Sequence, residues 1–304
     1  MRRRLPLIAA LVVAATCAFG APAPAGAAPA APAAPGGSVA WQPSGRQVLG
    51  RPVLYTGNSG NAFVAWMDPE LVRPAVVPGT GDPLGSPWGG QVDPAQRPFL
   101  VSGFNGGFKF GDFTGAVLAF GNRYRAPVDG QGSFIVYDDG SFTVGAWGRD
   151  NDPNKQVVAL RQNLGMLVDN GAPTAAAALP ASWGASLSGA VTMRSGVGVD
   201  ANGALVWAGG RLSPQDLANA LIAAGAVRGM QMDINPDWVN FNSYDVGADG
   251  IAHGNGIFGA TGPDRFLRPN GRDFIAVFVR GTVAKGATAK LGAAPLQASV
   301  RVRG

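Results

Sequence analysis

Short runs of β-branched and aromatic residues, separated by Gly, Asp and Asn, recur along most of the chain. Such runs are typical of strands, and the clusters between them are typical of turns. We expect strands at nine segments: 63–67, 98–102, 116–120, 133–137, 141–145, 196–200, 204–208, 274–280 and 299–303. Asp139-Gly140 and Asn202-Gly203 predict tight hairpin turns, because these residues tolerate positive φ.

One segment has the marks of an amphipathic helix. Ser213 is suited to the N-cap, Pro214 to the first helical position and Gly225 to the end, and Leu217 and Leu221 define an apolar face. An apolar strand over 227–234 follows, so 196–234 is expected to form a ββαβ unit. A weaker helical pattern covers 155–162. The fold class we predict is α+β: a single, mostly β domain with a ββαβ unit.

The first 37 residues differ from the rest. Arg2–Arg4, the apolar run 5–19 and the small residues before position 28 predict a signal peptide over 1–27. An Ala/Pro-rich tether over 28–37 and the domain over 38–304 then follow. No later apolar run reaches the length of a membrane span, so no span is expected after signal removal. The predicted location is secreted or in the cell envelope.

Composition narrows the possible chemistry. Of the 304 residues, 46% are hydrophobic, enough for a sizeable core. The formal charge of +5 includes the three leader arginines; without them 21 basic residues face 19 acidic ones, so nucleic-acid binding is not expected. Cys17 lies in the leader, which leaves no disulfide. His253 is the only histidine, and we predict no metal site and no cofactor.

Three polar segments stand out beside predicted strands. The glycines of Asn105-Gly106-Gly107 can let a backbone approach a ligand, or simply make a tight turn. Arg194 can hold an anion with its bidentate fork, or form an ordinary ion pair. Asp233, near the end of an apolar strand, is costly to bury unless it is used in chemistry, is paired or caps a neighbouring loop.

In this order the three segments resemble the phosphodiester glycosidase family. The family pattern has an Asn-Gly-Gly-Phe-Phe turn, an Arg-Thr/Ser-x-x-Gly strand, a helix, and a strand ending in Asn-Leu-Asp-Gly-Gly. Residues 105–108, 194–198 and 213–233 match it, and the resemblance covers roughly 100–244. Lys109 replaces the second Phe, and Asn235-Pro236-Asp237 replaces the glycines after the aspartate, as in a divergent bacterial branch.

The resemblance implies a phosphodiester-glycosidase-like fold and a glycan or glycosyl-phosphate substrate. It implies that Asp233, Arg194 and Asn105 are catalytic. The residues expected to bind substrate are Gly106, Gly107, Arg161, Asn163, Asp169, Asn235, Asp237 and Trp238.

The expected function is a secreted hydrolase of glycosyl phosphodiester or related glycosidic bonds in envelope or extracellular glycans. The alternative is a non-catalytic glycan-binding or structural protein on the same fold. We further expect Arg161, Asn163 and Asp169 to lie near the same cleft as Asn105.

Overall fold

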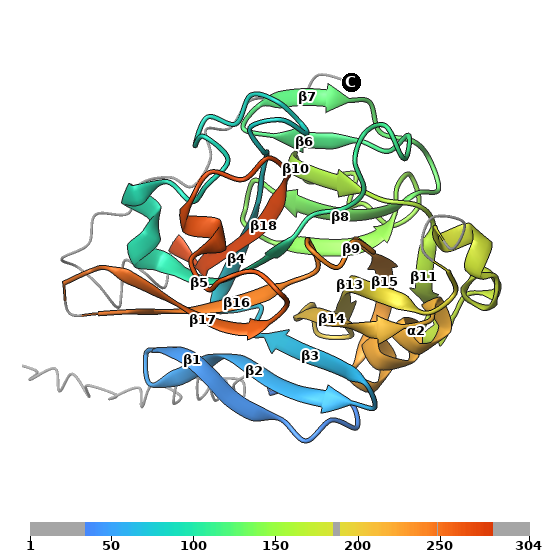
Figure 1. Ribbon diagram of the computed structural model, residues 1–304, viewed down its shortest axis with the longest axis horizontal. Helices are drawn as coiled ribbons and strands as arrows, with labels where there is room; N and C mark the ends of the chain where they lie inside the picture. Colours follow the sequence, from blue (N-terminus) through green and yellow to red (C-terminus); the bar gives the residue numbers. More distant parts are fainter. Residues whose placement is uncertain (1–33, 185–188, 248, 282–304) are drawn as a thin grey trace, which may run out of the picture. The chain divides into compact units, whose positions relative to one another are not determined.

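The computed structural model describes residues 34–184, 189–247 and 249–281, which form three antiparallel sheets and one α-helix (Figure 1). The predicted signal peptide, most of the predicted tether and the predicted strand 299–303 lie outside these residues. The eight-stranded sheet has the order β1-β2-β3-β14-β13-β15-β11-β12, with strands β1 (Gln42–Val48), β2 (Arg51–Ser59), β3 (Ala62–Met67), β11 (Met166–Asp169), β12 (Ala172–Pro173), β13 (Thr192–Asp200), β14 (Leu205–Leu212) and β15 (Ala226–Gln231).

Two five-stranded sheets complete the described part. One has the order β7-β6-β10-β8-β9, with β6 (Val117–Ala119), β7 (Asn122–Arg125), β8 (Gly132–Tyr137), β9 (Phe142–Ala146) and β10 (Val157–Gln162). The other has the order β17-β16-β5-β18-β4, with β4 (Val72–Val77), β5 (Leu100–Asn105), β16 (Phe241–Val246), β17 (Ala252–Phe258) and β18 (Phe274–Val279). Short 3₁₀-helices are η1 (Pro94–Phe99), η2 (Ala175–Ala178), η3 (Pro180–Trp183) and η4 (Arg265–Leu267). The prediction of a mostly β architecture is confirmed.

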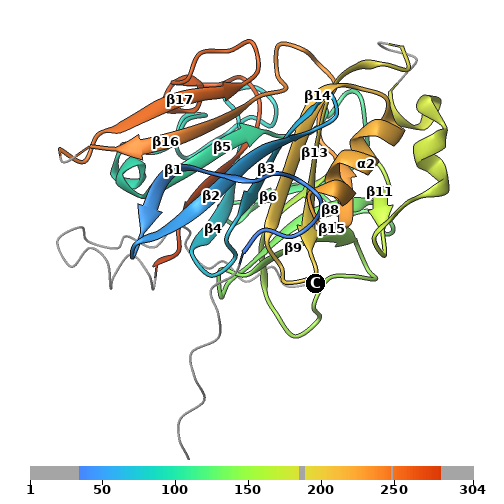
Figure 2. The same cartoon turned by 90° about the horizontal axis from the view of Figure 1, so that it is seen from below.

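The helix α2 (Pro214–Ala223) begins and ends as its sequence predicts. Ser213 Oγ accepts the amide of Asp216, and the Asp216 carboxylate accepts the amide of Ser213, which forms a capping box. Leu217 and Leu221 are buried against the eight-stranded sheet, beside which α2 lies in Figure 2. The opposite face of that sheet packs on the other two sheets in a large apolar core that includes Phe134, Trp207 and Phe241.

Three predicted secondary-structure elements need correction. Residues 155–162 contain no helix: β10 pairs with β6 and β8 there, because the β-branched pair Val157-Val158 favours a strand that has neighbours on both sides. The strand expected at 98–102 starts at Leu100, since Pro98 belongs to η1, whose start is capped by Asp93. The strand expected at 227–234 ends at Gln231, so Asp233 lies on the loop beyond β15.

The chain at the junction of the predicted tether and the predicted domain contacts α2. Ser38 donates its amide to the carbonyl of Ala223 at 2.8 Å, and the Trp41 indole donates to the carbonyl of Gly36 at 2.9 Å. The chain is therefore attached to the C-terminal end of α2 from about Gly36 onward.

A buried ion pair joins two sheets next to the turn after β5. Arg161 on β10 donates through Nε to Asp273 Oδ2 at 2.6 Å, directly before β18, and both side chains are almost fully buried. The turn passes very close to this pair. A Cβ on Gly106 would lie 2.1 Å from Asp273 Oδ2, and one on Gly107 would lie 3.0 Å from the Arg161 guanidinium carbon. Gly106 therefore leaves no room for a side chain, whereas a Cβ on Gly107 would require the Arg161 guanidinium to shift by a few tenths of an ångström.

This close approach gives a stability prediction. Gly106→Ala should lower the free energy of unfolding by about 3 kcal/mol, since the added methyl must displace a buried carboxylate. Gly111→Ala on the same loop is the matched control, because its Cβ meets no atom within 4 Å, and a change within about 0.5 kcal/mol is expected. Urea unfolding of the three proteins measures this, and equal stability of the two variants would contradict it.

Candidate functional site

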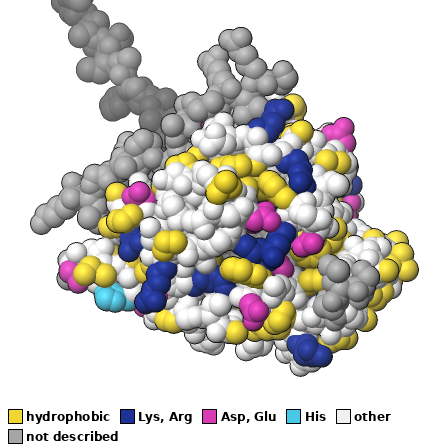
Figure 3. All heavy atoms as spheres, turned by 45° about the horizontal axis from the view of Figure 1, so that its top comes forward, with side chains coloured by type: hydrophobic (Ala, Val, Ile, Leu, Met, Phe, Trp, Pro, Cys, Tyr) yellow, Lys and Arg dark blue, Asp and Glu magenta, His cyan; other side chains and the backbone are white. Residues whose placement is uncertain are grey.

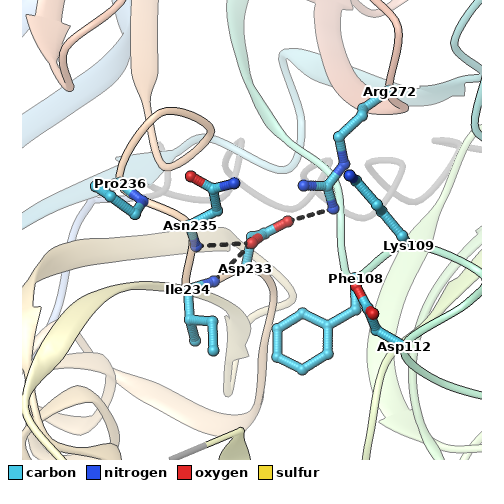
Figure 4. Close-up of a pocket in the computed structure, with 8 residues that line it drawn as sticks. All are labelled: Phe108, Lys109, Asp112, Asp233, Ile234, Asn235, Pro236 and Arg272. Atoms are coloured by element: carbon cyan, nitrogen blue, oxygen red, sulfur yellow. Dashed lines mark hydrogen bonds and ion pairs between the residues drawn. The ribbon is translucent and has the colours of Figure 1, made fainter. Parts of the chain in front are cut away.

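A cavity opens where three chain segments meet (Figure 4). These are the turn after β5, the loop after β15 and the residues just before β18. The cavity has a volume of about 350 Å³. Its lining consists of Phe108, Lys109, Asp112, Asp233, Ile234, Asn235, Pro236 and Arg272.

Asp233 is the buried carboxylate of this cavity, and it is 3% exposed. Its Oδ1 accepts the amides of Ile234 at 2.7 Å and Asn235 at 2.9 Å, and its Oδ2 accepts Arg272 Nη2 at 2.5 Å. Burial raises the pKa of Asp233 above its ordinary value, because the charged form loses water; Arg272 and the two amides act in the opposite direction. Hydrogen bonds thus hold the Asp233 carboxylate in one orientation, and burial raises its pKa.

Arg272 contacts Asp233 directly in the lining of the cavity (Figure 4). Its Nη2 also donates to the carbonyl of Gly107 at 2.6 Å, and its guanidinium lies 5.1 Å from the ring centre of Trp238. Arg265 lies on the same ring at 4.3 Å. Among the described residues, neither Nε nor Nη1 of Arg272 has a protein acceptor, and the exposed ammonium of Lys109 has none. These donors can bind an anion that enters the cavity.

Asn105 lies behind the cavity rather than in its wall. Its Nδ2 donates to the carbonyl of Gly106 at 2.9 Å and to Ser195 Oγ at 2.8 Å, and its Oδ1 accepts the amide of Asn240. Ser195 in turn accepts the amide of Asp233 at 3.3 Å. Asn105 is buried, and its contacts position the loop that carries Asp233.

Arg161 and Asn163, like Asn105, contact the backbone of the turn after β5. Arg161 Nη2 donates to the carbonyl of Phe108 at 2.6 Å, and Asn163 Oδ1 accepts the amide of Phe108 at 3.3 Å. Asn163 Nδ2 donates to the carbonyls of Gln231 and Met232. Both side chains therefore hold Phe108 next to the loop after β15, and neither lines the cavity. Gly106 and Gly107 likewise serve close packing rather than the cavity wall.

Arg194, expected to be catalytic, is not at this cavity. Its guanidinium donates to the carbonyls of Trp183 and Leu212 and to Gln231 Oε1, with longer contacts to the carbonyls of Gly189 and Ala190. Burial lowers the pKa of Arg194 to about 10. The side chain is completely enclosed and satisfied by protein acceptors, so it ties a loop to β13. Arg194 is therefore neither an anion clamp nor part of an ordinary ion pair, the two roles expected from the sequence.

Asp169 is the second expected residue that lies elsewhere. Its carboxylate forms a bidentate pair with Arg149, at 2.8 and 2.9 Å, beside a different cavity. The prediction that it shares the cleft of Asn105 is therefore wrong. Among the residues after Asp233, Asn235 lines the first cavity and Asp237 is exposed outside it. Trp238 does not line the cavity, but its ring lies against the Arg272 guanidinium.

Sequence reasoning missed Arg272 and its neighbour Asp273. They stand side by side before the apolar run 274–279, so a pair of opposite charges next to a buried strand was an available signal. Asp112, an exposed carboxylate on the cavity, was also missed. It lies on a loop where Lys109 is the only other charged residue, and no local pattern distinguishes it.

The described residues offer neither a metal-binding cluster nor a membrane-spanning helix. They contain no group of three or more His, Cys, Asp or Glu side chains arranged to hold a metal ion. None of their helices is long and apolar enough to cross a membrane. On the face shown in Figure 3, basic side chains lie next to acidic ones.

Comparison with known proteins identifies the fold. No family description matches the sequence, and no curated protein matches it. Among solved structures it is similar to the catalytic domain of zebrafish N-acetylglucosamine-1-phosphodiester alpha-N-acetylglucosaminidase, auto-inhibited by its pro-peptide: 15% identity and a TM-score of 0.50, over 80% of this chain and 88% of that one. A hypothetical protein from Synechocystis is 14% identical with a TM-score of 0.41, over 82% of this chain and 69% of that one. The chain thus shares its fold, distantly, with a glycosidase catalytic domain.

Proposed function

We propose that this protein hydrolyses the bond between a sugar and a phosphate in glycosyl phosphodiesters. The observation that carries the proposal is the buried Asp233–Arg272 pair, which faces a cavity edged by Lys109. The pair offers one carboxylate for proton transfer, and the unpaired donors of Arg272 and Lys109 suit a phosphate. The distant likeness to a glycosidase domain supports the same class of reaction.

The mechanism follows from these groups. The phosphate of the diester binds to Arg272 Nε and Nη1 and to Lys109. Asp233 takes a proton from a water molecule, whose oxygen attacks the anomeric carbon. The bond from that carbon to the phosphate oxygen breaks, and its electron pair leaves with the phosphate as a monoester. Because the guanidinium already holds the leaving phosphate, its charge stabilises the negative charge that develops there.

The location of the protein belongs to the proposal. We propose that residues 1–27 direct export, that 28–37 link the leader to the domain, and that the substrates are glycans outside the cell. N-terminal sequencing of secreted protein should then begin at Ala28. Recovery of secreted protein that begins at Met1 would contradict this part.

Removal of the carboxylate tests the role of Asp233. Asp233→Asn should reduce hydrolysis of hexose 1-(methyl phosphate) diesters by about 10²–10⁴-fold, since an amide cannot accept the proton. Its oxygen can still accept the two loop amides, but Arg272 is left without its counter-charge, so stability should also fall. Asp152→Asn is the matched control, because Asp152 also accepts the amide two residues ahead at 2.9 Å and lies outside the cavity.

The double variant Asp233→Asn/Arg272→Gln separates catalysis from stability. It removes both buried charges, so its stability should exceed that of Asp233→Asn, whereas hydrolysis should stay lost. Rates are corrected for the folded fraction measured by circular dichroism. Hydrolysis that returns with stability in the double variant would mean that the pair is only structural, as in a non-catalytic glycan-binding protein.

The raised pKa of Asp233 predicts the acid limb of the pH profile. An ordinary Asp takes up its proton near pH 3.9. Burial shifts that uptake to higher pH in Asp233, and only the ionised form can act as the base. The second-order rate constant kcat/KM should therefore fall on acidification with a midpoint above about pH 4, over a range where the fold persists. A rate that is constant down to about pH 3.9 would exclude Asp233 as the base.

A further inference from the structure

A second cavity lies where the sheet of β8 and β9 meets the eight-stranded sheet. It has a volume of about 510 Å³ and shares no lining residue with the first. Its lining consists of Asp129, Gly130, Ala146, Trp147, Gly148, Arg149, Met166 and Asp169. Arg228 on β15 fixes the two sheets together here, since it donates to the carbonyl of Val144 and to Thr143 Oγ1.

Trp147 provides an aromatic surface in this cavity. Its backbone is held on both sides, because its amide donates to the carbonyl of Gln131 and its carbonyl accepts the amide of Gly130. The side chain is half-buried and packs against an apolar cluster that includes Ile135 and Leu160. Its indole N–H has no acceptor among the described residues and stays accessible to solvent. A fixed ring with a free donor is suited to a ligand that has both an apolar face and hydroxyl groups.

The carboxylates of the cavity are oriented in advance. Arg149 binds Asp169 and Asp150 in two bidentate pairs, with all four N–O distances between 2.7 and 2.9 Å. These pairs occupy Arg149 and fix the direction of the Asp169 oxygens, which keep free lone pairs. Asp129, whose carboxylate lies over Gly148, has no donor among the described residues.

The charge of the lining selects the ligand class. Asp129 and Asp169 outnumber the single cation Arg149, whose donors are already used, so an anion is disfavoured. Hydroxyl groups can donate to the carboxylates, and the open space over Gly130, where a Cβ would meet no atom within 4 Å, lets a ring approach the backbone. An uncharged sugar ring has the apolar C–H face and the rim of hydroxyl donors that this lining requires.

We propose that this second cavity binds an uncharged sugar ring of a polysaccharide, with Trp147 against its apolar face and Asp129 and Asp169 accepting its hydroxyls. The site is separate from the Asp233–Arg272 cavity and does not depend on hydrolysis. It gives the residue Asp169, expected from the sequence to bind substrate, a place in a distinct carbohydrate site.

Calorimetric titration of the mature protein tests the proposal. The probes are three neutral hexasaccharides, β-1,4-linked N-acetylglucosamine, β-1,4-linked glucose and α-1,4-linked glucose, and one anionic heparin hexasaccharide. We expect at least one neutral probe to bind, with a Kd that rises at least tenfold in Trp147→Ala and severalfold in Asp129→Asn. Trp41→Ala is the matched control, since it removes another half-buried indole outside both cavities, and it should leave Kd unchanged.

Three results would overturn the proposal. They are binding of no neutral probe, neutral binding that is unchanged in Trp147→Ala and Asp129→Asn, and preference for the anionic probe. Asp129→Asn keeps the test decisive if Trp147→Ala does not fold, because Asp129 is exposed and unpaired among the described residues. Loss of hydrolysis in Asp233→Asn with intact sugar binding is compatible with the proposal, so the two sites are tested separately.

Discussion

The buried charges around the turn after β5 are the constraint on which the site depends. Arg272 and Asp273 are adjacent in sequence, opposite in charge, and reach in different directions to Asp233 and Arg161. A buried charge without a partner would cost several kcal/mol, so the four side chains must stay together. Because Arg161 and Arg272 also hold the carbonyls of Phe108 and Gly107, these pairs fix the turn as well as each other.

This arrangement explains why several polar residues near the cavity do not line it. The side chains of Asn105, Arg161 and Asn163 donate mostly to backbone carbonyls of the turn and of the segment before Asp233. These bonds hold the loop of Asp233 against the turn. Among the buried side chains around the turn, Arg272 keeps donors free for a ligand, and the exposed Lys109 adds its ammonium at the cavity edge. The chemistry that we propose therefore depends mainly on Asp233 and Arg272, and the surrounding polar residues position them.

The sequence was sufficient for the parts of the fold that depend on local patterns. The capped helix α2, the Asp-Gly and Asn-Gly hairpins and most strands follow from periodicity and turn chemistry. The helix expected at 155–162 failed because the neighbours of β10 come from segments far away in sequence, and their pairing outweighs local propensity.

The site was only partly predictable for a related reason. Asp233 was found because an acid beside an apolar strand is conspicuous, and Asn105 because it precedes two glycines. Arg194 was expected to have the role that we propose for Arg272, since the sequence cannot tell which arginine reaches a carboxylate and which reaches carbonyl groups. Asp169 was assigned to the wrong cavity because the direction of a strand end depends on sheet packing.

Hydrolysis in water enriched in oxygen-18 tests the central claim most directly. If Asp233 directs water to the anomeric carbon, the released phosphate monoester carries no label, and its ³¹P resonance is not shifted by the isotope. Labelled phosphate would place the attack at phosphorus, and unchanged diester would mean that the cavity does not catalyse the reaction. Either result would contradict the role assigned to the Asp233–Arg272 pair.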